Sequence, residues 1–410
     1  MTFEEKASLF LYFGYLPVFD SNWDECPWMK KAPTSKNEHS MMNEADLILE
    51  GIKSWKNSIK NCITENESYI VPLSGGLDSR AILAELLELG FKDKITTVTY
   101  GSPGTWDFDI GTGIADKLKL DHCSIDLNRI LIDRDKLKQA LHSGGEWTDL
   151  FTTYFNKMIP LKFGHESLYW TGYMGDPISG SHLSKRDSKT LNEAWERFVD
   201  RNKMSVSYKV AKRDIIMKCI NIDQLMQPQS ISYDEMFDFQ VRQQSYIKRV
   251  VTTGGYRFAC PFIQAHWVNY MVNIPRNYRT DQRLYRRILL KAYPELFSYP
   301  TKFLKGLPLN AAHVKILNNK IEYKVGRAIE KLTGLKRMNR NMNYIDFDDA
   351  FRNRKDYNQL GCEMLTSLQA RKVLNFKPLD IWDSHLKRNK SHQDIIRLMI
   401  SLEIMTQEGY

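Results

Sequence analysis

Short β-rich runs and helical runs alternate between residues 69 and 171, and this alternation restricts the fold more than any other feature of the sequence. Strands are expected at 69–73, 95–100, 123–127 and 168–171, and helices at about 79–89 and 108–118. This order is typical of a parallel sheet with right-handed crossovers. The sequence therefore predicts an α/β fold in which helices flank a parallel sheet.

Helical periodicity dominates the remainder of the chain. A helix is expected from Asn43 to about Cys62, and helical patterns broken by prolines recur after about residue 190. The first 40 residues are aromatic-rich and irregular, and are interrupted by Trp23, Pro27, Trp28 and Pro33. We therefore divide the chain into an N-terminal arm, a sheet-containing domain and a helical, basic C-terminal extension, at 1–40, 41–310 and 311–410.

The composition is that of an ordinary soluble enzyme, with 42% hydrophobic and 26% charged residues. The apolar stretch from Leu9 to Phe19 is shorter than the roughly 20 residues that cross a bilayer, so no membrane association is expected. No signal peptide is recognisable, and the six cysteines form no CxxC pair. Reduced thiols and a cytoplasmic location are the expectation.

The net charge of +9 raises the question of an anionic partner. Much of the excess lies late in the chain, at 336–340, 352–355 and 387–390. Basic runs of this kind are more often a solvated face than a nucleic-acid surface, so nucleic acid is not the expected partner.

The first chemically informative segment, Ser74-Gly75-Gly76-Leu77-Asp78-Ser79, is placed where an apolar strand gives way to a helix. Glycines allow close backbone approach, and a helix N-terminus offers unpaired N–H groups to a phosphate. A carboxylate in such an anion cradle needs a bridging cation, so Asp78 is interpreted as a magnesium ligand. The alternative is a tight turn in which Asp78 only caps the helix.

The second segment runs from Gly172 to His182 and also follows a strand. Its carboxylate, Asp176, is flanked by Gly172 and Gly175, and it suits the other side of the same triphosphate. The two aspartates can then share one metal ion. The alternative is a structural Asx turn before Pro177.

Together with Tyr256–Phe262, these two segments resemble the synthetase domain of the asparagine synthetase family, over roughly residues 5 to 310. The resemblance implies a PP-loop domain of the adenine nucleotide alpha hydrolase type that binds ATP and Mg²⁺ and adenylates a carboxylate. It implies that Asp78 and Asp176 hold the magnesium. It also places residues at the end of the second strand near adenine, namely Val98, Thr99, Tyr100 and Gly101.

The family also uses a late lysine to stabilise charge on the adenylate, which the resemblance places at Lys302 or, as second choice, at Lys305. Tyr173 stands where asparagine synthetases carry a glutamate and where lactam-forming members carry a catalytic tyrosine. Glu235, or Asp238 one helical turn later, is the candidate carboxylate partner of Tyr173. A surface lysine and a packed tyrosine are the alternative interpretations.

The resemblance also has a departure, because Met1 is followed by Thr2 and not by the nucleophilic cysteine of the family's glutaminase domain. We therefore expect the amine to come from free ammonia, from a separate glutaminase or from the substrate itself. The acid could be a small molecule, a glycan or a peptide.

The expected function is thus an ATP-dependent amide-forming ligase. Tyr173 favours an intramolecular lactam or macrolactam cyclase as the first alternative, while the positive charge suits an acidic sugar substrate. Two alternatives come from other classes: a PP-loop tRNA-modifying enzyme, for which Cys123 and Cys260 lack activating neighbours, and a nucleotide-binding protein without catalysis.

Overall fold

The structure is a computed structural model, which describes residues 1–17, 42–64, 67–204, 210–220, 222, 225–226, 230–333, 338–388 and 390–410. The aromatic and proline residues used to predict an N-terminal arm, Trp23, Pro27, Trp28 and Pro33, lie outside the described residues. The expectation of irregular structure is wrong for Phe3–Phe13, which form a helix with a capping box and six buried side chains.

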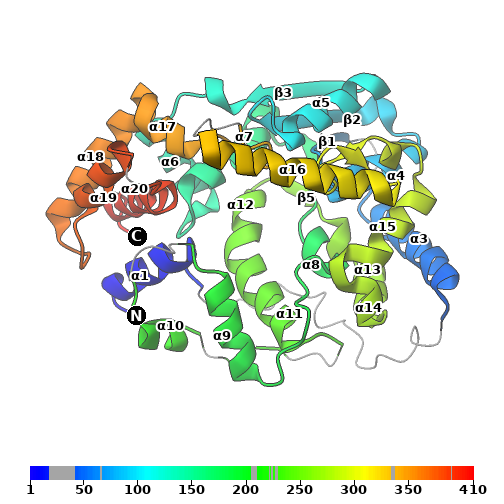
Figure 1. Cartoon of the computed structure of the whole chain (residues 1–410), viewed down its shortest axis with the longest axis horizontal. Helices are drawn as coiled ribbons and strands as arrows, with labels where there is room; N and C mark the ends of the chain where they lie inside the picture. The colour runs from blue at the N-terminus through cyan, green and yellow to red at the C-terminus, as the bar shows by residue number, and fades with distance from the viewer. Residues whose placement is uncertain are drawn as a thin grey trace.

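A five-stranded parallel sheet with strand order β3-β2-β1-β4-β5 forms the centre of the fold (Figure 1). The strands are β1 (Ser68–Pro72), β2 (Ile95–Gly101), β3 (Asp121–Asp126), β4 (Ser167–Trp170) and β5 (Arg257–Ala259). The four strands predicted from the sequence are confirmed. β5 was not predicted as a strand.

Both faces of the sheet are buried. Tyr69 and Val71 of β1 join one apolar cluster, whereas Ile70 joins the cluster on the opposite face, as the alternation of a strand requires. Helices of the first cluster are α3 (Glu44–Lys60), α4 (Asp78–Glu88), α5 (Trp106–Leu118), α13 (Ala265–Asn273) and α15 (Arg283–Ala292). The second face is covered by α7 (Leu150–Phe163), through Ile159. The predicted helices α3, α4 and α5 are confirmed.

A second, larger core is helical and joins segments from both ends of the chain. Its helices are α1 (Phe3–Phe13), α6 (Arg134–Ala140), α9 (Leu191–Arg201), α11 (Tyr233–Phe237), α17 (Phe347–Asn353), α18 (Lys355–Arg371), α19 (Pro378–Leu386) and α20 (Gln393–Gln407). Figure 1 shows α1 beside α20, with both chain ends on the same side of the molecule. The predicted boundary at residue 310 therefore does not separate the two cores.

The remaining elements complete the fold, and some add side chains to these cores, such as Ile178 to the first and Ile216 to the second. They include α8 (Gly175–Ser179), α10 (Arg213–Lys218), α12 (Arg249–Val251), α14 (Arg276–Arg279), α16 (His313–Thr333) and the hairpin of β6 (Pro300–Thr301) and β7 (Leu307–Pro308). A π-helix, η6 (Asp238–Lys248), continues α11 without a break. π-Helices are rare, usually span a single turn, and frequently occur at functional sites.

Gly111 and Gly113 give a matched test of how closely α5 packs on β1. A Cβ at Gly111 would lie 2.6 Å from the main-chain oxygen of Leu73, whereas nothing lies within 4 Å of a Cβ at Gly113. Alanine is favoured over glycine inside a helix by about 1 kcal/mol, so Gly113→Ala should raise the free energy of unfolding by up to that amount. Gly111→Ala must displace a main-chain atom and should lower it by about 1–3 kcal/mol. Urea unfolding of both variants measures the difference, and a shift of both in the same direction would contradict the described packing.

Candidate active site

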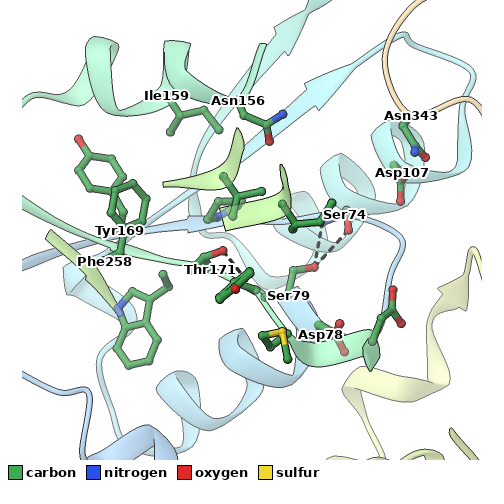
Figure 2. Close-up of a pocket in the computed structure, with 18 of the residues that line it drawn as sticks. Ser74, Asp78, Ser79, Asp107, Asn156, Ile159, Tyr169, Thr171, Phe258 and Asn343 are labelled. Carbon is green, nitrogen blue, oxygen red and sulfur yellow. Dashed lines mark hydrogen bonds between the residues drawn. The ribbon is translucent and has the colours of Figure 1, made fainter. Parts of the chain in front are cut away.

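The two glycine-rich segments meet at the carboxyl edge of the sheet. Strand order reverses around β1, which has β2 on one side and β4 on the other. Open α/β sheets bind their ligands in the crevice at such a reversal. Here the crevice contains a cavity of about 440 Å³, lined by the ends of β1 and β4 and by residues of α7 and η6 (Figure 2).

The first segment forms a compact loop before α4. The N–H of Ser74 donates to Oγ of Ser79 at 3.3 Å, and the N–H of Gly76 donates to Oγ of Ser74 at 3.2 Å. A Cβ at Gly75 would lie 2.8 Å from the main-chain oxygen of Trp106, so this position requires glycine. Leu77 is the N-cap of α4 and provides no side-chain cap, which leaves the first N–H groups of this helix facing the loop. The segment therefore has the construction of an anion site.

Asp78 is the first residue of α4 and does not cap it. Its Oδ1 accepts a hydrogen bond of 2.9 Å from the hydroxyl of Tyr285, and a Cβ at Gly175 would overlap its Oδ2. Oδ1 of Asp176 accepts from the amide of Gln282 at 3.0 Å. Burial, and then the negative charge of Asp176, raise the pKa of Asp78 well above its usual value. The two loops thus bring two carboxylates together.

This pair fits a divalent cation bound jointly with phosphate oxygens. Mg²⁺ in proteins is usually bound by one or two carboxylates, and substrate phosphates and water molecules complete its coordination shell. A bound cation would also offset the repulsion between the two carboxylates. Within the described ranges, no group of three or more His, Cys, Asp or Glu side chains could hold a metal ion without other ligands. If Mg²⁺ binds here, Asp78 and Asp176 are the residues that would hold it.

Lys302 lies beside the Ser74–Ser79 loop. Its N–H donates to the main-chain oxygen of Gly75 at 2.8 Å, and its ammonium group contacts the side chains of Asp107 and Asn343. Figure 2 shows Asp107 and Asn343 next to each other at the edge of the cavity. The structure therefore brings the first-choice lysine to the predicted site.

Lys302 does not itself line the cavity but contacts two residues that do, Asp107 and Asn343. The second-choice lysine, Lys305, also lies outside the lining. Its ammonium group lies 3.3 Å from the centroid of the Tyr323 ring of α16. Asn319, also of α16, donates to the main-chain oxygens of Leu304 and Lys305 at 3.0 and 3.2 Å. Lys305 thus belongs to the packing of α16, and Lys302 is the better candidate.

Arg80, which directly follows the first segment, is completely buried. Its guanidinium donates to the main-chain oxygens of Leu296, Tyr299 and Pro300, at 2.7 Å for Pro300. Burial lowers its pKa to about 10, so the group is charged at neutral pH. Arg80 therefore ties α4 to the segment that leads into Lys302.

Of the residues predicted near adenine, Tyr100 lines the cavity and its hydroxyl donates to Oδ1 of Asn156 at 2.7 Å. Gly101 ends β2 with a φ of +149°, close to Asn343. Val98 is fully buried, and its main-chain oxygen already accepts from the N–H of Leu73 at 2.8 Å. Of these residues, Tyr100 could contact a ligand in the cavity, whereas the side chain of Val98 is buried and does not line it.

Tyr173 lines the cavity, and its hydroxyl donates to the main-chain oxygen of Gln243 at 3.1 Å and accepts from the amide of Gln244 at 3.1 Å. The predicted partner Glu235 is occupied elsewhere. One of its oxygens accepts from Arg279 at 2.6 Å, and the other accepts from Ser232 in the capping box of α11. The predicted pairing of Tyr173 with Glu235 is therefore wrong, because the Glu235 carboxylate caps the N-terminus of α11 and pairs with Arg279.

The alternative carboxylate, Asp238, belongs to a group that the sequence did not reveal. Its Oδ2 lies 2.7 Å from Nδ1 of His182, and both His182 and Arg242 line the cavity. His182 ends the second glycine-rich segment and could have been noticed there. No sequence motif pointed to Arg242, because only the π-helical geometry of η6 brings this residue to the cavity.

No family model matches this chain, and no curated protein is significantly similar to it. The fold is a five-stranded parallel sheet flanked by helices, with a mainly helical C-terminal half. In the described part of the chain, no helix combines the length and apolar character that crossing a membrane demands.

Removing the Arg80 side chain should destabilise the protein, since three main-chain oxygens would lose a buried donor. We expect Arg80→Met to lower the free energy of unfolding by about 3 kcal/mol. The free energy of unfolding of Arg80→Lys should lie between those of the wild type and Arg80→Met, because an ammonium group cannot reproduce the planar fork of a guanidinium. The matched control is Arg129→Met, whose side chain is 87% exposed and should change stability by less than about 0.5 kcal/mol. Equal effects of the two methionine variants in urea unfolding would refute this role.

Proposed function

We propose that the protein is an ATP-dependent ligase that activates a carboxylic acid as its adenylate and transfers the acyl group to an amine. The observation that carries the proposal is the pairing of Asp78 and Asp176 beside the uncapped N-terminus of α4. A magnesium nucleotide would complement this arrangement, because Mg²⁺ would bind between the carboxylates and the phosphates would bind at the N-terminus of α4.

The reaction would proceed in two displacements. An oxygen of the acid attacks the α-phosphorus of ATP, and pyrophosphate leaves. The nitrogen of the amine then attacks the carbonyl carbon, AMP leaves, and one proton is released. The Ser74–Ser79 loop and the first N–H groups of α4 would bind the phosphates, and Mg²⁺ would neutralise part of their charge.

Lys302 would stabilise the negative charge that develops during both steps. Its main chain is fixed to Gly75 and its ammonium group is held by Asp107 and Asn343, so it needs little reorganisation to act. Preorganised charges of this kind are worth roughly 3–4 kcal/mol in the transition state.

Three of the described cysteines give no support to the tRNA-modifying alternative, which would need reactive thiols for sulfur transfer. Burial raises the pKa of Cys260 and of Cys219 to about 12 and that of Cys62 to about 11. Reactive cysteines have depressed pKa values, so these thiols are poor nucleophiles at neutral pH.

Pyrophosphate–ATP exchange tests the proposal directly. Purified protein is incubated with Mg²⁺, ATP, labelled pyrophosphate and a panel of acids that includes amino acids, hexuronic acids and acidic peptides. Label should appear in ATP with at least one acid and should disappear in Asp176→Asn. Exchange with no acid on a broad panel, although ATP binds, would remove the basis of the proposal.

Substitution of Gly175 should weaken MgATP binding as much as substitution of either carboxylate, because a Cβ at this position overlaps the Asp78 side chain. We expect Gly175→Ala to reduce MgATP affinity at least tenfold while the fold is retained. Gly113→Ala, in which the added methyl group meets open space, is the matched control and should bind MgATP like the wild type. Isothermal titration calorimetry measures both. Unchanged affinity in Gly175→Ala would show that Asp78 does not contact the nucleotide.

A further inference from the structure

A second cavity of about 1320 Å³ adjoins the nucleotide cavity. The two cavities share a wall formed by Arg242, Ile247, Val251, Asn343 and Tyr344. The second cavity exceeds the roughly 300–1,000 Å³ of an ordinary small-molecule site. The protein therefore has space for a sizeable second ligand directly beside the proposed nucleotide.

The walls of the second cavity combine polar and apolar side chains, and several of their ionic groups pair with one another. Arg397 binds both Asp149 and Asp394, and Arg352 binds Asp348. The lining also contains side chains that offer neutral hydrogen bonds, namely Thr152, Asn339, Asn353, Ser391 and Gln393. Such walls suit a ligand whose body carries hydroxyl or amide groups and little charge.

Arg242 is the cation that stands at the junction, since it lines both cavities. It comes from the π-helix η6, and its guanidinium lies 4.0 Å from Oδ1 of Asp238, a distance beyond a hydrogen bond. A guanidinium binds a carboxylate through two parallel hydrogen bonds. Arg242 is thus placed to hold an acid between the two cavities.

His182 and Asp238 form a pair at the same junction. Nδ1 of His182 lies 2.7 Å from Oδ2 of Asp238, and the amide of Gln243 donates to Oδ1 of Asp238 at 3.3 Å. This hydrogen bond fixes the imidazole and leaves Nε2 as the nitrogen available to a ligand. A carboxylate that orients a histidine is the arrangement of a general base.

We propose that this junction is the acyl-transfer site, where Arg242 binds the carboxylate of a polar acid whose body fills the second cavity and His182 accepts the proton of the attacking amine. Asp238 is a positioning residue, because it acts through His182. The inference rests on the proposed ligase function and adds to it the class of acid and the base.

Arg242 orients the carboxylate whose oxygen attacks the α-phosphorus. When the amine nitrogen forms its bond to the carbonyl carbon, the bond from that carbon to the AMP oxygen breaks and AMP leaves as an anion. The proton that the nitrogen loses goes to Nε2 of His182 and from there to solvent.

Separating the two half-reactions tests the role of His182. With the acid that supports exchange in the wild type, His182→Gln should retain pyrophosphate–ATP exchange within about threefold but form the amide at least a hundredfold more slowly, as is typical for loss of a general base. His165→Gln is the control, since His165 stacks on Tyr256 and lines neither cavity. Amide formation by His182→Gln at the wild-type rate would overturn the proposal. Absence of exchange in the wild type would instead overturn the ligase function, and the proposal with it.

The pH profile tests Asp238. Burial lowers the pKa of His182, but the hydrogen bond and charge of Asp238 outweigh burial and raise it. Asp238 and Arg242 of η6 and Asp176 of α8 are the charged groups that act on this histidine. Wild-type transfer should slow as pH falls through the raised pKa, and in Asp238→Asn this decline should begin at lower pH. Asp238→Glu should restore part of the wild-type profile. An identical profile in Asp238→Asn would refute the pair.

The acid dependence of exchange tests Arg242. Arg242→Met should raise KM for the acid at least tenfold and leave KM for ATP within about twofold. Arg249→Met, a change in the next turn of the same helical run outside both cavities, should alter neither. An unchanged KM for the acid in Arg242→Met would show that the carboxylate binds elsewhere.

Discussion

The buried guanidinium of Arg80 is the interaction on which the candidate site depends. It lies at the start of α4, and its hydrogen bonds reach three main-chain oxygens more than 200 residues later in the chain. The next residues place the main chain of Lys302 against Gly75. This link joins the Ser74–Ser79 loop to the segment that carries the lysine from within the core. A single side chain thus converts a local turn into a site built from both ends of the sheet domain.

The two carboxylates illustrate the opposite case, an arrangement that costs stability. Asp78 and Asp176 repel each other, and burial adds to the penalty. Backbone strain collects around the same place, because Met174, Asp281 and Gln282 all have positive φ although none is glycine. Strain of this kind persists only where the surroundings enforce it. Its concentration beside Asp176, which Gln282 contacts, supports a ligand-binding role for this side of the cavity.

The first four strands of the sheet and the helices α3, α4 and α5 could be predicted from periodicity, because a sheet buried on both faces gives continuous apolar runs. The helices α1, α6 and α7 were not predicted. Motifs next to strand ends predicted that Asp78 and Asp176 would lie close together, whereas Lys302 was proposed only from the family resemblance. Glu235 was misassigned because sequence spacing cannot distinguish a capping carboxylate from a catalytic one. β5, with only Arg257–Ala259, is too short for a periodic signal, and nothing in the order of residues 238–248 distinguishes a π-helix from an α-helix.

The π-helix makes the number of residues in this segment as important as their identity. Successive residues of an α-helix are turned by about 100°, so losing one residue from 238–248 would rotate every later side chain of the run by roughly that angle. Tyr246, Ile247 and Val251, which face the cavities, would then point into the helical core or away from it. Relatives of this protein should therefore tolerate substitutions along η6 more readily than single-residue deletions, and an alignment gap there would mark a change of substrate.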